Sequence, residues 1–163
     1  MKIVLMLILL FPIFFAEEST VPEAEPSKMK GMVDRHNFWR KEVGVKPLKW
    51  SDKLAKIAQA WANKQSRKDC GCSHSPDDKY GENIYCSEGI DSDPKDVADD
   101  WASEREYYDA ESGKCKGGEC GHYTQMVWRK TTEVGCGMAK CGDKEIWVCN
   151  YNPPGNYVSQ KPY

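Results

Sequence analysis

The chain has 163 residues and a formal net charge of −2 at pH 7, and 29% of its residues are charged while 40% are hydrophobic. This length predicts one domain with a core of its own and argues against two domains. Acidic and basic residues are interleaved without a basic stripe, which excludes nucleic acid as an expected partner.

The first 16 residues have the pattern of a secretory signal peptide. Lys2 supplies a positive charge, and an almost uninterrupted apolar run from Ile3 to Phe15 follows it. The expected cleavage site lies after Ala16. The run is shorter than the roughly 20 apolar residues that cross a bilayer, and no later segment reaches that length. We therefore expect a secreted, extracellular protein without a membrane span.

Eight cysteines lie beyond residue 16, and in an exported chain this even number predicts four disulfides. On the order of a hundred pairings are compatible with eight cysteines. A zinc site is the alternative, because cysteine and histidine ligands at short spacing also occur in metal-binding modules. Bridges are favoured, because the spacings do not form two close pairs and the expected compartment is oxidising.

Residues 17–26 are acidic and contain two prolines, so we expect a flexible leader there and a single domain over residues 27–163. Between Met29 and Val43, apolar side chains recur every three or four positions, which predicts a helix that ends before Gly44. His36 lies on the apolar face of this helix. A histidine in that position is expected to be a core residue rather than a ligand.

A second helix is predicted after Ser51, a residue suited to the N-cap position, and its apolar face extends from Leu54 to Ala62. This is the clearest amphipathic pattern in the chain. Residues 64–79 are polar and hold two cysteines, so they predict a loop pinned by bridges. Residues 81–85 are too few to classify.

A third helix is predicted to begin with Asp93 as its N-cap and Pro94 at its first position, and to end before Gly113. Residues 122–128 favour a short fourth helix. The period then changes to two, which is typical of strands.

Residues 134–140 and 145–151 predict a β-hairpin, because Gly142 and Asp143 separate two alternating segments. Cys136 and Cys149 lie close enough across this hairpin to form a bridge. Since helices come early in the chain and paired strands come late, the sequence predicts an α+β domain.

Four motifs then carry a resemblance to a known family: HSPDDKYGENIY at 74–85, WASEREYYD at 101–109, CGHYTQMVWR at 120–129 and VCNYNPPGNY at 148–157. Over about residues 30–163 the chain resembles the CAP superfamily of cysteine-rich secretory proteins, venom antigens and plant pathogenesis-related class 1 proteins, and it is most similar to the plant class. The resemblance implies an α-β-α sandwich with a central antiparallel sheet, stapled by disulfides.

The resemblance also implies how the cysteines pair. Three bridges correspond to those of the family, and the two remaining cysteines would form a fourth, which departs from the six cysteines of the plant pattern. The expected disulfides are Cys70–Cys141, Cys115–Cys120, Cys136–Cys149 and, as the fourth, Cys72–Cys86.

Two histidines and two glutamates that the family keeps in a central cleft correspond to His74, Glu82, Glu104 and His122. Imidazoles and carboxylates are good ligands for Zn²⁺ or another divalent metal, although the resemblance requires no cofactor. The alternative is a polar cleft whose members hydrogen bond one another. Spacing alone would not reveal this group, because its members are scattered along the chain.

A metal-dependent hydrolase is a further alternative. Ser73, Ser75 and Ser103 flank the four cleft residues in sequence, but none lies in a nucleophile-elbow motif and no oxyanion-hole motif is present. We therefore expect a binding protein rather than an enzyme.

The loop between Tyr107 and Cys120 corresponds to the region with which some family members bind sterols. Tyr107 and Tyr108 are its aromatic residues, and a bridged loop would lose little entropy on binding a flat ring system. The alternative is that both tyrosines pack against the end of the third helix. The expected partner is a sterol or a related lipid, bound by a monomer that acts in defence or host–microbe interaction.

Plant members of the family can also release a defence peptide from the C-terminus. The corresponding segment is Pro153–Tyr163, so the alternative function is that of a precursor of a signalling peptide, with a processing protease or a protein receptor as partner. Prolines and glycine disfavour regular structure in this segment, and we expect the tail to be accessible to a protease.

Overall fold

The computed structural model describes residues 23–163. The predicted signal peptide and residues 17–22 of the predicted leader lie outside the described residues, so both stay predictions. The elements are η1 (Ser27–Met29), α1 (Met32–Glu42), β1 (Lys49–Trp50), α2 (Asp52–Lys68), β2 (Gly81–Glu88), α3 (Pro94–Ser103), η2 (Glu104–Tyr107), β3 (Tyr108–Asp109), β4 (Lys114–Cys115), α4 (Gly121–Met126), β5 (Glu133–Cys141) and β6 (Lys144–Asn152).

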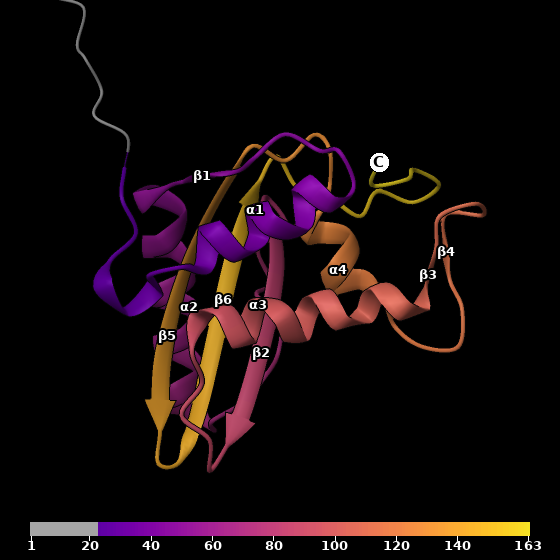
Figure 1. Ribbon diagram of the computed structural model, residues 1–163. Coiled ribbons are helices and arrows are strands. Elements are labelled where there is room, and N and C mark those ends of the chain that lie inside the picture. The colour runs from indigo at the N-terminus through magenta and orange to yellow at the C-terminus, as the bar shows by residue number, and fades with distance from the viewer. Residues whose placement is uncertain (1–22) are drawn as a thin grey trace, which may run out of the picture.

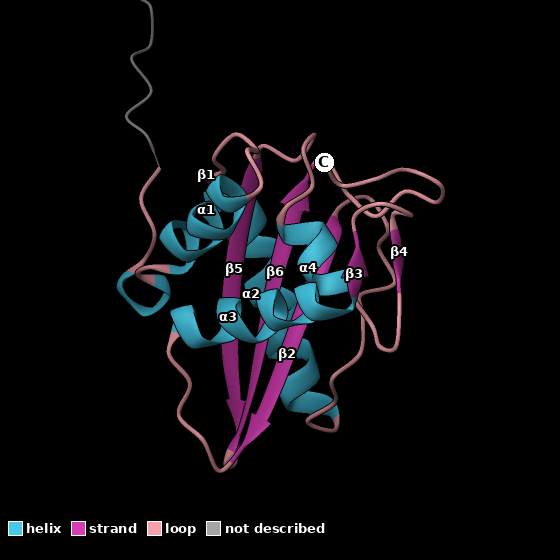
Figure 2. Cartoon of the chain, turned by 45° about the vertical axis from the view of Figure 1, so that its right-hand side comes forward, coloured by secondary structure: helices cyan, strands magenta, loops and turns pink. Residues whose placement is uncertain are grey.

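The domain has three layers, as the α+β prediction requires (Figure 1). Helix α2 covers one face of the four-stranded sheet, and α1, α3 and α4 cover the other (Figure 2). Glycines make the contact with α2 close, because a Cβ atom at Gly135 or Gly137 of β5 would collide with the backbone of α2 at Ala55 or Gln59. The α-β-α sandwich is therefore confirmed.

The sheet is mixed rather than antiparallel, which corrects one part of the prediction. Its strand order is β1-β5-β6-β2, and β1 pairs with β5 in parallel while the other two pairs are antiparallel. The hairpin of β5 and β6 forms as predicted. Local turn signals can identify such a hairpin. Strand β1, in contrast, is separated from its partner β5 by α2, β2 and α3 among other elements, so no turn specifies whether the two strands pair in parallel.

Strand β2 is the element that the sequence left unclassified. It pairs with β6 from Gly81 opposite Tyr151 to Glu88 opposite Lys144. Its side chains do not alternate cleanly between buried and exposed, so the period of two is absent. Its partner lies more than 50 residues away in sequence, and no hairpin turn announces the pairing.

Helix starts follow their predicted caps. The Ser51 hydroxyl accepts a hydrogen bond from the amide of Leu54 at 3.5 Å, and the Asp93 carboxylate accepts one from the amide of Lys95 at 2.8 Å. Both helices begin at the next residue, with Pro94 in the first position of α3. The two N-cap predictions are confirmed.

Three helix boundaries differ from the predictions. Helix α3 ends at Ser103 and is followed by the 3₁₀ helix η2, whereas the predicted helix ended just before Gly113. Helix α1 begins at Met32 rather than Met29, because Gly31 adopts a left-handed φ of 95° that interrupts the helical path. Helix α2 continues to Lys68, into the predicted loop of residues 64–79. The buried Gln65 stabilises this last part by donating a hydrogen bond to the carbonyl oxygen of Ser73 at 2.5 Å.

Residues 23–26, which belong to the predicted leader, are attached to the domain by their acidic side chains. The Glu25 carboxylate accepts hydrogen bonds from the amides of Gly31 at 2.9 Å and Val33 at 2.5 Å. The Glu23 carboxylate accepts one from the amide of Asp52 at 2.5 Å. Acceptors at these positions satisfy amides at the starts of α1 and α2 that have no partner within the helix.

All four predicted disulfides are present: Cys70–Cys141, Cys72–Cys86, Cys115–Cys120 and Cys136–Cys149. Cys136 and Cys149 lie directly opposite each other in the β5–β6 ladder. The additional Cys72–Cys86 bridge ties the loop after α2 to strand β2. No free cysteine remains among the described residues.

His36 is a core residue, as the sequence predicted. It is fully buried, with Nδ1 at 2.8 Å from the carbonyl oxygen of Met32 and Nε2 at 2.8 Å from the hydroxyl of Tyr151. Burial lowers the pKa of its imidazole to about 4, which keeps the ring neutral. Over residues 23–163, no helix combines the length and apolar character needed to cross a membrane.

Candidate functional site

The four predicted cleft residues form two histidine–glutamate pairs. In the first, Nδ1 of His74 lies 2.8 Å from Oε1 of Glu82, which also accepts a hydrogen bond from the amide of Ser75 at 2.9 Å. His74 lies in the loop after α2 and is 64% exposed, whereas Glu82 lies in β2 and is 9% exposed. The Cys72–Cys86 bridge holds this loop next to the strand.

The second pair is more enclosed and connects η2 to α4. Nδ1 of His122 lies 2.6 Å from Oε1 of Glu104, while Oε2 of Glu104 accepts hydrogen bonds from the amides of His122 at 2.8 Å and Tyr123 at 3.3 Å. Burial opposes ionisation of Glu104, but the hydrogen bonds and charge of His122 outweigh it and lower the pKa of the carboxyl. The imidazole also stacks on Trp101, with ring centroids 6.2 Å apart.

A cavity of about 210 Å³ brings three of these residues together. It is lined by His74, Glu82, Asn83, Glu119, Gly121, His122 and Asn156. We call it the histidine cavity. Glu104 does not line it and instead fixes the orientation of His122. The predicted group therefore divides into residues that face the cavity and one that positions a neighbour.

Sequence reasoning did not find Glu119 or Asn156 as cavity residues. Glu119 precedes Cys120, so the Cys115–Cys120 bridge and the start of α4 set its position. Asn156 comes from the C-terminal segment, 34 residues beyond His122. The one available signal was that both residues lie within or next to the quoted motifs.

The donor atoms that face this cavity bear on the predicted zinc site. Because each histidine uses Nδ1 for a glutamate, Nε2 is the only ring nitrogen of His74 and of His122 that remains free to bind a metal. Between residues 23 and 163, no three His, Cys, Asp or Glu side chains converge so as to hold a metal ion. Oε2 of Glu82 is buried and lacks a hydrogen-bond partner within this region. Metal binding stays a prediction.

The serines named for a hydrolase have other partners. Oγ of Ser73 accepts a hydrogen bond from Gln65 at 2.8 Å, Oγ of Ser75 accepts one from the amide of Asp77 at 3.2 Å, and Oγ of Ser103 donates to the carbonyl oxygen of Asp100 at 2.6 Å. Within the described part of the chain, no serine hydroxyl hydrogen bonds a histidine. A serine nucleophile activated by a histidine base is therefore not assembled there.

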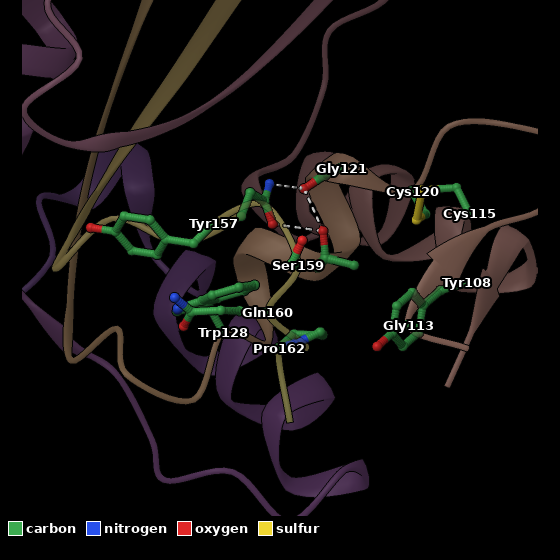
Figure 3. Close-up of a pocket in the computed structure, with 12 residues that line it drawn as sticks. Tyr108, Gly113, Cys115, Cys120, Gly121, Trp128, Tyr157, Ser159, Gln160 and Pro162 are labelled. Carbon is green, nitrogen blue, oxygen red and sulfur yellow. Dashed lines mark hydrogen bonds between the residues drawn. A yellow bond between two sulfur atoms is a disulfide. The ribbon is translucent and has the colours of Figure 1, made fainter. Parts of the chain in front are cut away.

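A second cavity, of about 270 Å³, lies between the β3–β4 loop and the C-terminal segment (Figure 3). We call it the aromatic cavity. Figure 3 shows Tyr108 and the Cys115–Cys120 bridge on one side, and Trp128, Tyr157 and Gln160 on the other. Its lining residues are Tyr108, Gly113, Cys115, Cys120, Gly121, Thr124, Trp128, Asn156, Tyr157, Ser159, Gln160 and Pro162.

The two tyrosines of the predicted lipid-binding loop have different positions. Tyr108 lines the aromatic cavity and packs against Tyr123 and Tyr163, with ring centroids 5.9 Å and 5.7 Å away. Tyr107 is 42% exposed and does not line the cavity. Its ring covers Gly118, where a Cβ atom would collide with it. Tyr108 is thus positioned both to pack and to contact a ligand.

The C-terminal segment is attached to the domain at its end, while residues 156–161 stay exposed, so accessibility to a protease stays a prediction. Nζ of Lys161 donates to the carbonyl oxygens of Ala110 and Glu111 at 3.0 Å and 2.7 Å, and the carbonyl oxygen of Pro162 accepts from the amide of Arg129 at 2.7 Å. Prolines prevent regular structure here but leave carbonyl groups free for irregular hydrogen bonds. The middle of the segment stays exposed, at 92% for Val158.

A family model and a curated relative both match most of the chain. Residues 33–151 match the model of the cysteine-rich secretory protein family, CAP. The chain is 40% identical to the pathogenesis-related protein PR-1 of Medicago truncatula, over 98% of this chain and 95% of that protein.

Solved structures agree with this match. The venom allergen-like protein 4 of Schistosoma mansoni has a TM-score of 0.69 at 28% identity, over 85% of this chain and 94% of that one. The structure of NaASP2 with Zn²⁺ has a TM-score of 0.71 at 25% identity, over 86% and 90% of the two chains. Together with the four disulfides and the layered α+β fold, these matches show that the chain belongs to the CAP family of cysteine-rich secretory proteins.

Proposed function

We propose that this protein is a secreted defence protein that binds a sterol or a related lipid in the aromatic cavity. The observation that carries the proposal is the position of that cavity. The loop that the resemblance associates with sterols forms one of its walls, and three aromatic side chains, Tyr108, Trp128 and Tyr157, line it. Aromatic surfaces suit a flat, rigid ring system.

The size of the cavity limits how such a ligand would lie. About 270 Å³ is slightly below the roughly 300–1,000 Å³ that is typical of small-molecule sites. A sterol would therefore bury part of its ring system and leave the remainder over the exposed surface of the C-terminal segment. The bridge between Cys115 and Cys120 supports this mode, because a closed loop loses little entropy on binding.

Two further observations support the cellular role. The similarity to a plant pathogenesis-related protein extends over almost the whole chain, which favours a part in defence. Four disulfides and the signal-peptide pattern of residues 1–16 favour export to an oxidising compartment. Neither observation requires an enzymatic reaction.

The test is saturable binding of a radiolabelled sterol to the purified, oxidised protein, with unlabelled sterol as competitor. Tyr157→Ala should weaken binding about tenfold, because a partly exposed aromatic wall of the cavity is removed. Phe38→Ala is the matched control, since Phe38 is an aromatic residue of similar exposure on α1, away from the cavity. Absence of saturable binding to the unmodified protein would refute the proposal.

We propose divalent metal binding in the histidine cavity as a second capacity. The buried, unpaired Oε2 of Glu82 favours it, as does the orientation of both imidazoles by carboxylates, a common arrangement around metal-bound histidines. NaASP2, a protein of the same fold, has been solved with Zn²⁺. A bound metal would supply Lewis acidity in the cavity, with Nε2 of His74, Nε2 of His122 and Oε2 of Glu82 as its protein ligands.

Calorimetric titration of dialysed protein with zinc chloride at neutral pH tests this second proposal. His74→Ala and His122→Ala should each abolish uptake, whereas Glu104→Gln should weaken it, because Glu104 does not line the cavity and would act on the metal only through the ring of His122. Uptake that survives both histidine substitutions would place the metal elsewhere. Absence of uptake by the unmodified protein would refute the capacity itself.

A further inference from the structure

We infer that the histidine cavity and the aromatic cavity form one divided site for an amphiphile with a single hydroxyl head and a rigid apolar body. This inference rests on the proposed lipid binding and specifies which lipid is bound and in which orientation. Part of the apolar body occupies the aromatic cavity, the remainder lies over the exposed C-terminal segment, and the hydroxyl reaches into the metal-free histidine cavity.

The two cavities share part of their walls. Gly121 and Asn156 line both of them. Nδ2 of Asn156 donates a hydrogen bond to the carbonyl oxygen of Gly121 at 2.8 Å, and Oδ1 accepts one from Oγ1 of Thr124 at 2.7 Å. We assign the role of partition to the side chain of Asn156, because Gly121, the other shared residue, has no side chain. Asn156 is exposed, and its bonds reach only α4, so it can be displaced without disturbing the core.

The linings of the two cavities are complementary in character. The aromatic cavity has Tyr108, Trp128 and Pro162 among its walls and contains no histidine or carboxylate. The histidine cavity has two imidazoles and two carboxylates. Moving an apolar body from water into the aromatic cavity is favourable, because its apolar surface is removed from water. A polar head group must replace its hydrogen bonds to water, and the histidine cavity offers the partners for this.

The chemistry of His122 selects the head group. Its Nδ1 lies 2.6 Å from the Glu104 carboxylate, which leaves Nε2 as the ring atom available to a ligand. A hydroxyl can both donate and accept, so it can pair with Nε2 whether or not that nitrogen carries a proton, whereas an ether oxygen can only accept. The ligand class that this geometry favours is therefore a lipid alcohol such as a free sterol.

The partition can be removed without straining the backbone. Asn156 has a φ of 56°, in the left-handed region that glycine adopts without steric cost. Asn156→Gly thus deletes the side chain between the cavities and should tighten binding of a free sterol about tenfold, because the ligand no longer displaces two hydrogen bonds. Val158→Gly is the matched control for added flexibility, since Val158 lies in the same segment and lines neither cavity.

The position of the hydroxyl head in the histidine cavity is tested by ¹H–¹⁵N NMR of the histidine side chains. The protein is titrated with a free sterol and, separately, with its 3-methyl ether. The free sterol should shift the ring signals of His122 and His74. His36 is a built-in reference, because it is buried in the core with both nitrogens hydrogen bonded, and its signals should not move. The ether should bind about tenfold more weakly and leave all three rings unperturbed.

Each outcome has a separate meaning. If the unmodified protein binds no sterol, the proposed function fails and the inference fails with it. If sterol binds but the signals of His122 and His74 stay in place, or if the ether binds equally well, lipid binding stands and the divided site is refuted. Equal affinities for Asn156→Gly and Val158→Gly would also refute the role given to Asn156.

Discussion

The guanidinium of Arg40 donates a hydrogen bond from Nη1 to the carbonyl oxygen of Trp128 at 3.0 Å, although the two residues are 88 positions apart. The same side chain donates to the carbonyl oxygens of Lys46, Met126 and Thr131 at 2.7–2.8 Å. Arg40 is fully buried, and within residues 23–163 it forms no salt bridge. It therefore fixes the backbone that carries Trp128, a wall of the aromatic cavity.

Replacement of Arg40 should be strongly destabilising. Arg40→Met removes a donor from four carbonyl oxygens, three of them in buried hydrogen bonds, and in the described part of the chain only that of Trp128 keeps a backbone donor, the amide of Thr131. We expect the free energy of unfolding to fall by about 4 kcal/mol. Arg35→Met is the control on the same helix. Arg35 is 30% exposed and pairs with Asp99, so its loss should cost less than about 1 kcal/mol. Urea denaturation measures both, and equal effects would contradict the structural role of Arg40.

Stability should depend on pH through His36. Burial lowers the pKa of this histidine from 6.5 to about 4, so between these values the unfolded chain binds a proton that the folded protein does not. Stability then rises with pH, and the free energy of unfolding should drop by about 2 kcal/mol between pH 7 and pH 5. The nearest ionisable groups do not titrate in this range, because the pKa of Arg40 is about 10 and burial raises that of Tyr151.

The check is urea denaturation across this pH range for the unmodified protein and for His36→Gln. The variant is less stable at neutral pH, because its amide cannot reproduce both hydrogen bonds, but its stability should lose most of the dependence on pH. A slope that persists unchanged in His36→Gln would assign the proton uptake to other groups.

The additional disulfide should stabilise the protein less than the longest one. The Cys72–Cys86 bridge closes a separation of 14 residues and the Cys70–Cys141 bridge one of 71. From loop-closure entropy, replacing the first pair by alanine should lower the free energy of unfolding by about 3 kcal/mol, and replacing the second by about 4 kcal/mol. Thermal unfolding of the two double variants tests the order.

Removing the Cys72–Cys86 bridge should also act on the histidine cavity. The bridge holds the loop of His74 against β2, so its loss should broaden or shift the NMR signals of His74 while those of His122 stay unchanged. If both histidines respond equally, the bridge affects the whole domain rather than this loop.

Lys161 should protect the C-terminal segment from proteolysis. Tyr157 is 47% exposed and offers a cleavage site for chymotrypsin, but the hydrogen bonds of Lys161 limit how far the segment opens. Lys161→Met should speed cleavage after Tyr157 severalfold, as followed by mass spectrometry. Lys144→Met, in the β5–β6 hairpin, is the control. Unchanged cleavage in Lys161→Met would show that these bonds do not restrain the segment.

This result bears on the alternative function as a peptide precursor. Release of Pro153–Tyr163 requires access to Asn152, whose Nδ2 donates to Oε2 of Glu133 at 2.8 Å at the end of β6. The segment also forms part of both cavities through Asn156. A protein that has lost it would lose walls of the proposed lipid site, so we expect peptide release to abolish sterol binding.

Local signals explain which elements could be predicted. Ser51 and Asp93 act within a few residues, and the β5–β6 turn lies between its own strands, so these features followed from short stretches of sequence. The parallel pairing of β1 and the strand β2 depend on partners far along the chain. No local pattern encodes which strands pair in these two cases, because the pairing depends on how the layers pack.

The sequence by itself determined the main helices and the β5–β6 hairpin, because these depend on residue types at recognisable local spacing. Its four motifs also identified the family, and the resemblance to that family, not spacing, implied the four bridges and the four cleft residues. Only the tertiary structure decided that Glu104 positions His122 rather than facing the cavity, that Arg40 is buried among carbonyl groups, and that Asn156 lines two cavities. The physical reason is that these roles arise where distant segments pack together, and the hydrogen bonds that define them join residues up to 91 positions apart.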